Sequence, residues 1–134
     1  MRTLALALLA LVLVPSLAHA GGGTKNTGKI RVTNTSTGTV GVIVNPPSTL
    51  NPATATQAQF TAAGGRFVSG GANTTFTNLK AGANTVAAFY IDTATTPAIV
   101  GAAATSTVTV KSGATAVVRV AGDVLAAPTI TIVP

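Results

Sequence analysis

The sequence predicts an all-β protein: a single antiparallel β-sandwich of about seven to nine short strands, placed after a cleaved signal peptide. Short runs rich in Val, Thr, Ile and Phe are separated, at spacings of roughly 8–12 residues, by Gly, Pro and Asn. After the first twenty residues, no window supports a helix of about ten residues, because Thr is frequent, Leu is scarce and Glu is absent. The length of 134 residues suits one domain.

The first twenty residues have the three parts of a secretory signal peptide. Arg2 is the only charged residue among them, residues 4–14 are an unbroken apolar run, and Ala18-His19-Ala20 places small residues at a cleavage site. The apolar run is shorter than the roughly 20 residues that a membrane-spanning helix needs. We therefore expect cleavage after Ala20, export to the periplasm, cell surface or medium, and no membrane span in the mature chain.

Cleavage would divide the chain into a signal peptide at 1–20, a leader at 21–28 and a sandwich domain at 29–134. The leader holds four glycines and no apolar residue, so nothing in it offsets the entropy cost of ordering it. We expect it to be flexible.

The first two strands are expected at 29–34 and 39–44, where apolar residues alternate with other residues. The turn at 36–38 is short, which predicts that the two strands form a hairpin. Residues 45–47 then end the pairing, because Pro46 and Pro47 lack an amide donor.

The middle of the chain gives weaker signals. Residues 48–58 are expected to form a loop or a poorly paired edge. Phe60 and Phe67 mark two short strands around Gly64 and Gly65.

Residues 74–79 and 85–92 form the strongest turn-bounded pair, joined at 80–82. Residues 86–91 are apolar on both faces, which is typical of a central strand covered on both sides.

The last third predicts strands at 105–110, 115–120 and 129–133, with a turn at 111–114 between the first two. Alternation assigns one set of side chains to the core: Val108, Val110, Ala116, Val118, Val120, Ile130 and Ile132.

The composition removes most catalytic chemistry. The chain has no Cys, its only His is His19 in the signal peptide, and its acidic residues are Asp92 and Asp123. A Ser-His-Asp relay and a zinc site are excluded in the mature chain, and no phosphate-binding loop is present. Asp92 and Asp123 could form a glycosidase pair, but the sugar-stacking aromatic residues typical of such sites are lacking. We predict a protein that is not an enzyme, with no catalytic, cofactor-binding or metal-binding residue.

Lys111 and Ser112 are adjacent, as a nucleophile and a base would be, but a solvated hairpin turn explains them better.

The net charge of +6 comes from cations scattered singly, without interleaved aromatic residues. We expect no nucleic-acid partner. The alternatives for the charge are solubility and weak attraction to an anionic envelope surface.

Asn34 and Asn73 each begin a glycosylation sequon, which matters only in a host that glycosylates.

Two stretches, 29–45 and 76–120, carry a family resemblance. Leu79, Ala81, Gly82 and Val86 follow one hairpin pattern, and a second follows at Val108, Val110, Gly113 and Val118. The chain here resembles a bacterial exported domain of unknown function with an immunoglobulin-like or prealbumin-like sandwich. The resemblance implies an envelope or surface module and no activity; residues 46–72 have no counterpart in it.

Two functions follow as expectations. The first is an exported, non-catalytic surface or structural module of the envelope or extracellular matrix, which contacts other proteins or polysaccharide. The alternative is a small binding protein for a carbohydrate or other envelope ligand. Edge strands offer unpaired backbone groups for self-association. The candidate edges are 29–34 and 129–133, and Thr131→Pro is expected to remove a donor from the second.

Overall fold

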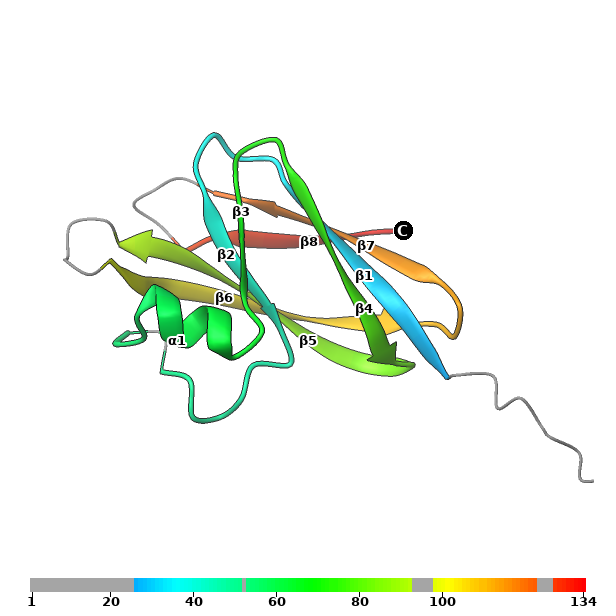
Figure 1. Ribbon diagram of the computed structural model, residues 1–134. Coiled ribbons are helices and arrows are strands. Elements are labelled where there is room, and N and C mark those ends of the chain that lie inside the picture. The colour runs from blue at the N-terminus through cyan, green and yellow to red at the C-terminus, as the bar shows by residue number, and fades with distance from the viewer. Residues whose placement is uncertain (1–25, 52, 93–97, 123–126) are drawn as a thin grey trace, which may run out of the picture.

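The computed structural model of the chain describes residues 26–51, 53–92, 98–122 and 127–134 (Figure 1). These residues form eight strands and one short helix, so the expected strand number is confirmed. In chain order the elements are β1 (Thr27–Asn34), β2 (Val40–Val44), α1 (Gln57–Ala62), β3 (Arg66–Val68), β4 (Asn73–Lys80), β5 (Gly82–Asp92), β6 (Ile99–Val110), β7 (Thr115–Ala121) and β8 (Thr129–Val133).

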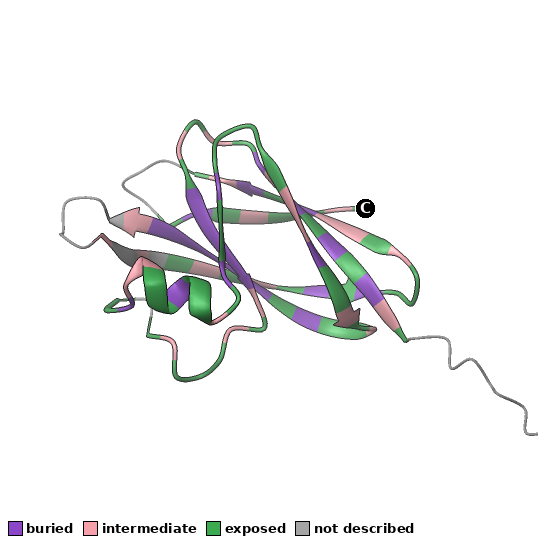
Figure 2. Cartoon of the chain, in the orientation of Figure 1, coloured by how far each residue is buried: buried purple, intermediate pink, exposed green. Residues whose placement is uncertain are grey.

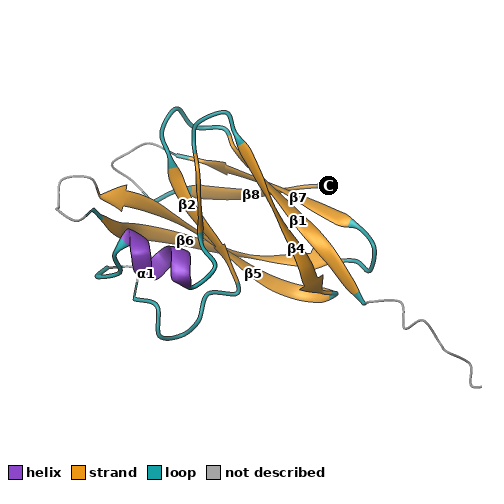
Figure 3. Ribbon diagram, viewed as in Figure 1, coloured by secondary structure: helices purple, strands orange, loops and turns teal. Residues whose placement is uncertain are grey.

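The strands form two sheets of four (Figure 3). One sheet has the order β4-β1-β7-β8 and the other the order β3-β2-β5-β6. Every described pairing is antiparallel except that of β1 with β7, which is parallel. The all-β sandwich is therefore confirmed, while the expectation that all its pairs are antiparallel is wrong.

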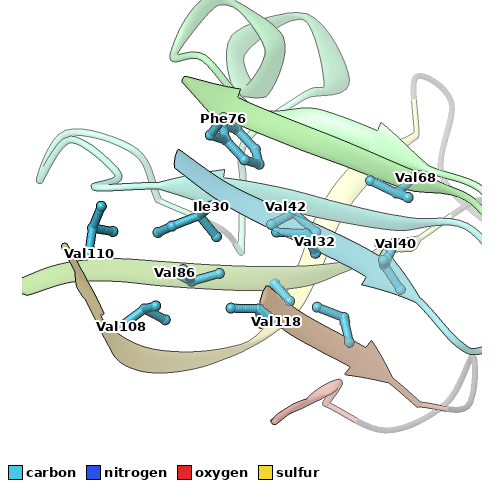
Figure 4. Close-up of a cluster of buried hydrophobic side chains, with 12 residues drawn as sticks. Ile30, Val32, Val40, Val42, Val68, Phe76, Val86, Val108, Val110 and Val118 are labelled. Carbon is cyan, nitrogen blue, oxygen red and sulfur yellow. The ribbon is translucent and has the colours of Figure 1, made fainter. Parts of the chain in front are cut away.

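The core lies between the two sheets, and every described strand except β8 supplies buried residues to it (Figure 4). Its residues are the apolar side chains on the inner faces, most of them β-branched, which suits a pleated surface. The buried set is Ile30, Val32, Val40, Val42, Val68, Phe76, Val86, Ala88, Val108, Val110, Val118 and Val120. The expected alternation is thus confirmed in these strands, and Ala116 and Ile130 pack against the set.

The expected hairpins are wrong in three places. β1 and β2 lie in different sheets, and so do β4 and β5, and β6 and β7. Each of these short connections crosses from one sheet to the other. A gap of about 10 Å between sheets is as easily crossed by a few residues as the roughly 4.8 Å to a neighbouring strand. Turn residues alone therefore do not distinguish the two paths.

Three pairs of consecutive strands are neighbours in the same sheet: β2–β3, β5–β6 and β7–β8. β5 lies between β2 and β6, and both of its faces carry buried residues, as expected for a central strand. β6 begins at Ile99, six residues before its expected start, and runs along β5 with one irregularity near Phe89.

Phe60 lies on α1, so the strand expected there is wrong. Thr56 caps the helix: its hydroxyl accepts from the Gln59 amide, and the Gln59 side chain accepts from the Thr56 amide. The helix covers the outer face of β2 and β5, where Phe60, Ile43, Ala87 and Phe89 form a second apolar cluster. This cluster explains why β5 is apolar on both faces.

Two glycines make room for the Phe60 ring. A Cβ at Gly65 would lie 2.5 Å from the ring, and one at Gly41 would lie 3.0 Å from it. Because neither residue has a side chain, the ring packs directly on the backbone.

Candidate interaction surface

The structure describes three of the four residues that sequence chemistry singled out: Asp92, Lys111 and Ser112. Asp92 ends β5, opposite Ile99 of β6, and Asp123 lies outside the described residues. Lys111 and Ser112 are both exposed in the connection between β6 and β7. Within the described ranges there is no group of three or more His, Cys, Asp or Glu residues that could hold a metal ion. The described helix is too short to cross a membrane.

One side of the sandwich is closed by Arg66. This side, called the closed side here, is formed by the edge strands β3 and β4. Arg66 reaches from β3 to β4, where its Nη1 donates to the Thr74 hydroxyl (3.1 Å) and to the Thr75 carbonyl (2.8 Å). Its guanidinium carbon lies 4.8 Å from the centre of the Phe76 ring, in cation–π geometry.

Without the Arg66 hydrogen bond, the Thr75 carbonyl would be free to accept from the backbone of an added strand. The Asn34 amide and carbonyl bond to the segment just before β4, so Asn34 directs its backbone groups towards β4. The direction of the backbone amide and carbonyl alternates along a strand. Those of Val32 therefore point to β4, and those of Arg31 point away from it. Thr75 lies opposite Arg31, and its carbonyl therefore points outwards. Arg66 occupies this acceptor and blocks strand addition there.

The opposite side, called the open side here, is formed by the edge strands β6 and β8. Neither strand contains a charged residue or a proline. Charges and prolines are the usual means by which edge strands avoid pairing with other chains. β8 has no buried residue (Figure 2).

The direction in which the backbone amides and carbonyls of β8 point follows from the hydrogen bonds between β1 and β7. The Lys29 amide donates to the Ala114 carbonyl and the Thr35 amide to the Val120 carbonyl, both at 2.9 Å. The backbone amides and carbonyls of the even-numbered residues of β7 therefore point to β1, and those of the odd-numbered residues point to β8. Arg119 lies opposite Thr131, so Thr131 points its amide inwards, at β7.

Alternation then directs the backbone groups of Ile130 and Ile132 away from the sheet. Thr131→Pro is consequently the wrong test of this edge, because it removes a donor to β7 and not an outward one.

Ile132 is the most exposed large apolar side chain among the described residues. It lies opposite Val118 and so on the core face, as expected, but 45% of its surface is exposed. Ile132 remains exposed because β8 ends its sheet and no further described strand covers this position. Beside it lies a pocket of about 330 Å³ whose lining includes Thr109, Lys111 and Ala116.

The other expected edge, 29–34, is not an edge. β1 lies between β4 and β7 and pairs with both. Only the prediction that 129–133 forms an edge is confirmed.

A second pocket, of about 310 Å³, lies next to α1. Asn51 and Gln59 contribute polar side chains to it, and Leu50, Ala62 and Ala63 contribute apolar ones. The Asn51 side-chain Oδ1 accepts from the Ala53 amide, and the Gln59 side chain takes part in the helix cap. No sequence pattern indicates this pocket, because its lining comes from a loop and a helix that alternation does not describe.

The two sequons differ in accessibility. Asn34 is fully buried, and its Nδ2 donates to the carbonyls of Gly38 (2.7 Å) and Val68 (2.8 Å). The bond to Val68 joins the end of β1 in one sheet to the end of β3 in the other. Asn73, at the start of β4, is exposed.

Comparison with family models, with curated proteins and with solved structures found no match to this chain.

Proposed function

We propose that the protein is an exported, non-catalytic surface or structural module of the cell envelope or extracellular matrix. It acts by contact, and its contact surface is the open side of the sandwich. The proposal combines the signal-peptide pattern of residues 1–20 with the chemistry of the two sides.

The observation that carries the proposal is the difference between these sides. At the closed side, Arg66 covers an outward carbonyl of β4 and stacks on Phe76. At the open side, β8 offers outward amides at Ile130 and Ile132, together with an exposed Ile132 side chain. An edge with unpaired backbone groups and an apolar side chain is a ready surface for adding a strand from another chain.

We further infer that the sandwich is closer to the prealbumin-like type than to the immunoglobulin-like type. In constant-type immunoglobulin domains the first two strands share a sheet. Here β1 and β2 lie in different sheets, and β1 pairs with β7 in parallel. This strand order supports the inference.

The alternative function is binding of a carbohydrate or another envelope ligand. The pocket next to α1 favours it, since amide side chains beside apolar ones suit a polar ligand with an apolar face. A thermal shift with soluble glycans that disappears in Thr54→Arg, which fills this pocket, would support the alternative.

Cell fractionation tests the proposal. We expect the protein outside the cytoplasm and retained by the envelope or matrix, and we expect Thr131→Lys at the open side to release it. Lys80→Arg, at the closed side, is the matched control and keeps it in place. Asp92→Asn and Asp123→Asn should leave the biological phenotype intact. Loss of an activity in either variant, with the circular dichroism of the folded protein retained, would overturn the proposal.

A further inference from the structure

We propose that β8 pairs antiparallel with β8 of a second copy of this chain, about a two-fold axis at Thr131. The inference rests on the proposed function, which assigns contact to the open side, and it names the partner. The pairing would join the two β4-β1-β7-β8 sheets into one continuous sheet.

The register follows from the direction of the backbone groups. Ile130 and Ile132 point their amides and carbonyls outwards, as derived above from the β1–β7 and β7–β8 pairings. With the axis at Thr131, Ile130 of one copy lies opposite Ile132 of the other, and each pair exchanges two hydrogen bonds. Every outward amide of β8 then has a partner.

The side chains agree with this register. On the core face, the exposed Ile132 would meet Ile130 of the second copy and lose apolar surface to water. On the outer face, Thr131 would lie opposite its own copy, and Thr–Thr pairs are favourable across strands. A second copy of the chain supplies the side chains for both contacts.

Two prolines limit the ladder. Continued alternation gives Pro128 and Pro134, which flank β8, the same outward direction as Ile130 and Ile132. Neither has an amide hydrogen. With the axis at Thr131 they lie opposite each other, so no hydrogen bond forms at either position and the ladder is confined to Ile130 and Ile132.

Charge also favours a second copy. The chain carries a net charge of +6, so most of its surfaces would repel a copy of themselves. β8 has no charged residue, and a two-fold contact brings like surfaces together. An uncharged edge is therefore the part of this molecule that best tolerates its own copy.

Cysteine cross-linking tests the register, since the chain has no native Cys. Thr131 and its copy would form a non-hydrogen-bonded pair with Cα atoms about 4.5 Å apart, within the range for a disulfide. Thr129, on the same strand and face, would lie about 14 Å from its copy. We expect mild oxidation of the exported protein to give at least tenfold more dimer for Thr131→Cys than for Thr129→Cys.

Charge exchange provides a second measurement. Thr131→Lys and Thr131→Glu should each sediment as monomers, because like charges meet at the axis. An equal mixture of the two should recover the dimer. Circular dichroism would show that both variants are folded.

The outcomes separate this inference from the proposed function. A monomeric wild-type protein, equal cross-linking at positions 129 and 131, or a dimer that both charged variants retain would each overturn the β8 pairing. If the protein is nevertheless retained outside the cytoplasm through the open side, the proposed function stands with a different partner. If it is neither retained nor dimeric, both proposals fail.

Discussion

At the scale of single residues, burial decides which side chains matter, and alternation predicts burial well. Val118 is fully buried and its neighbour Arg119 is exposed, as the sequence pattern predicts. Asn34 shows the opposite case. Its side chain ends an alternating strand, and only the fold reveals that it bonds to Val68 of the other sheet.

The β7 register gives the first prediction. Val118→Asp places an unpaired charge in the core, so it should cost more than about 4 kcal/mol and unfold the domain. Arg119→Ser should change the free energy of unfolding by less than about 0.5 kcal/mol. Urea unfolding followed by circular dichroism measures both. Similar losses for the two variants would mean that the register is wrong by one residue.

The sequons give the second prediction. In a glycosylating secretory host, folded protein should carry a glycan at Asn73 and none at Asn34, because the Asn34 amide is buried and bonded to two carbonyls. Mass spectrometry of peptides from the secreted monomer measures this. Asn73→Gln is the control and should yield folded protein without glycan. A glycan on Asn34 in folded monomer would contradict the described packing.

At the scale of elements, α1 and the position of strand 29–34 within its sheet were the least predictable parts. The helix has only six residues, and its apolar content is too small for a helical period to stand out. Its cap, Thr56 followed three residues later by Gln59, was a readable signal. Strand ends were better predicted, because Gly, Pro and Asn mark them.

The packing of α1 gives the third prediction. Phe60 is fully buried against Gly41 and Gly65, so Phe60→Ala should lower the free energy of unfolding by about 3–5 kcal/mol. Phe67, whose ring centre is 5.2 Å from that of Phe60, is 36% exposed and serves as the control. Phe67→Ala should cost clearly less in the same urea titration. Equal costs would place Phe60 outside the second apolar cluster.

At the scale of the whole molecule, the sandwich has two unlike sides. Arg66 joins the edges of the closed side, whereas the open side has two uncharged edges. This asymmetry is invisible in the sequence, since it depends on which strands end each sheet. It is the basis of the proposed contact function.

Export gives the fourth prediction, which belongs to the chain as a whole. The apolar run at 4–14 and the Ala18-His19-Ala20 site predict that native protein begins at Gly21. Intact mass and N-terminal sequencing measure this. Ala20→Pro should block processing and serves as the control. Protein of the envelope or medium that still begins at Met1 would refute cleavage.

The sequence by itself determined the all-β class, the approximate strand positions and the inward faces of most strands. These are local properties, because a side chain on an alternating strand needs only its neighbours to reveal its face. It also determined that few residues are available for catalysis.

Only the tertiary structure decided which strands pair. A short turn leads as easily to the facing sheet as to the next strand, because both lie within reach of a few residues. Thus β1 joins β4 and β7, not β2, and 29–34 is central while 129–133 is an edge. The outward direction of the Ile132 amide follows from those pairings, which connect residues far apart in the chain.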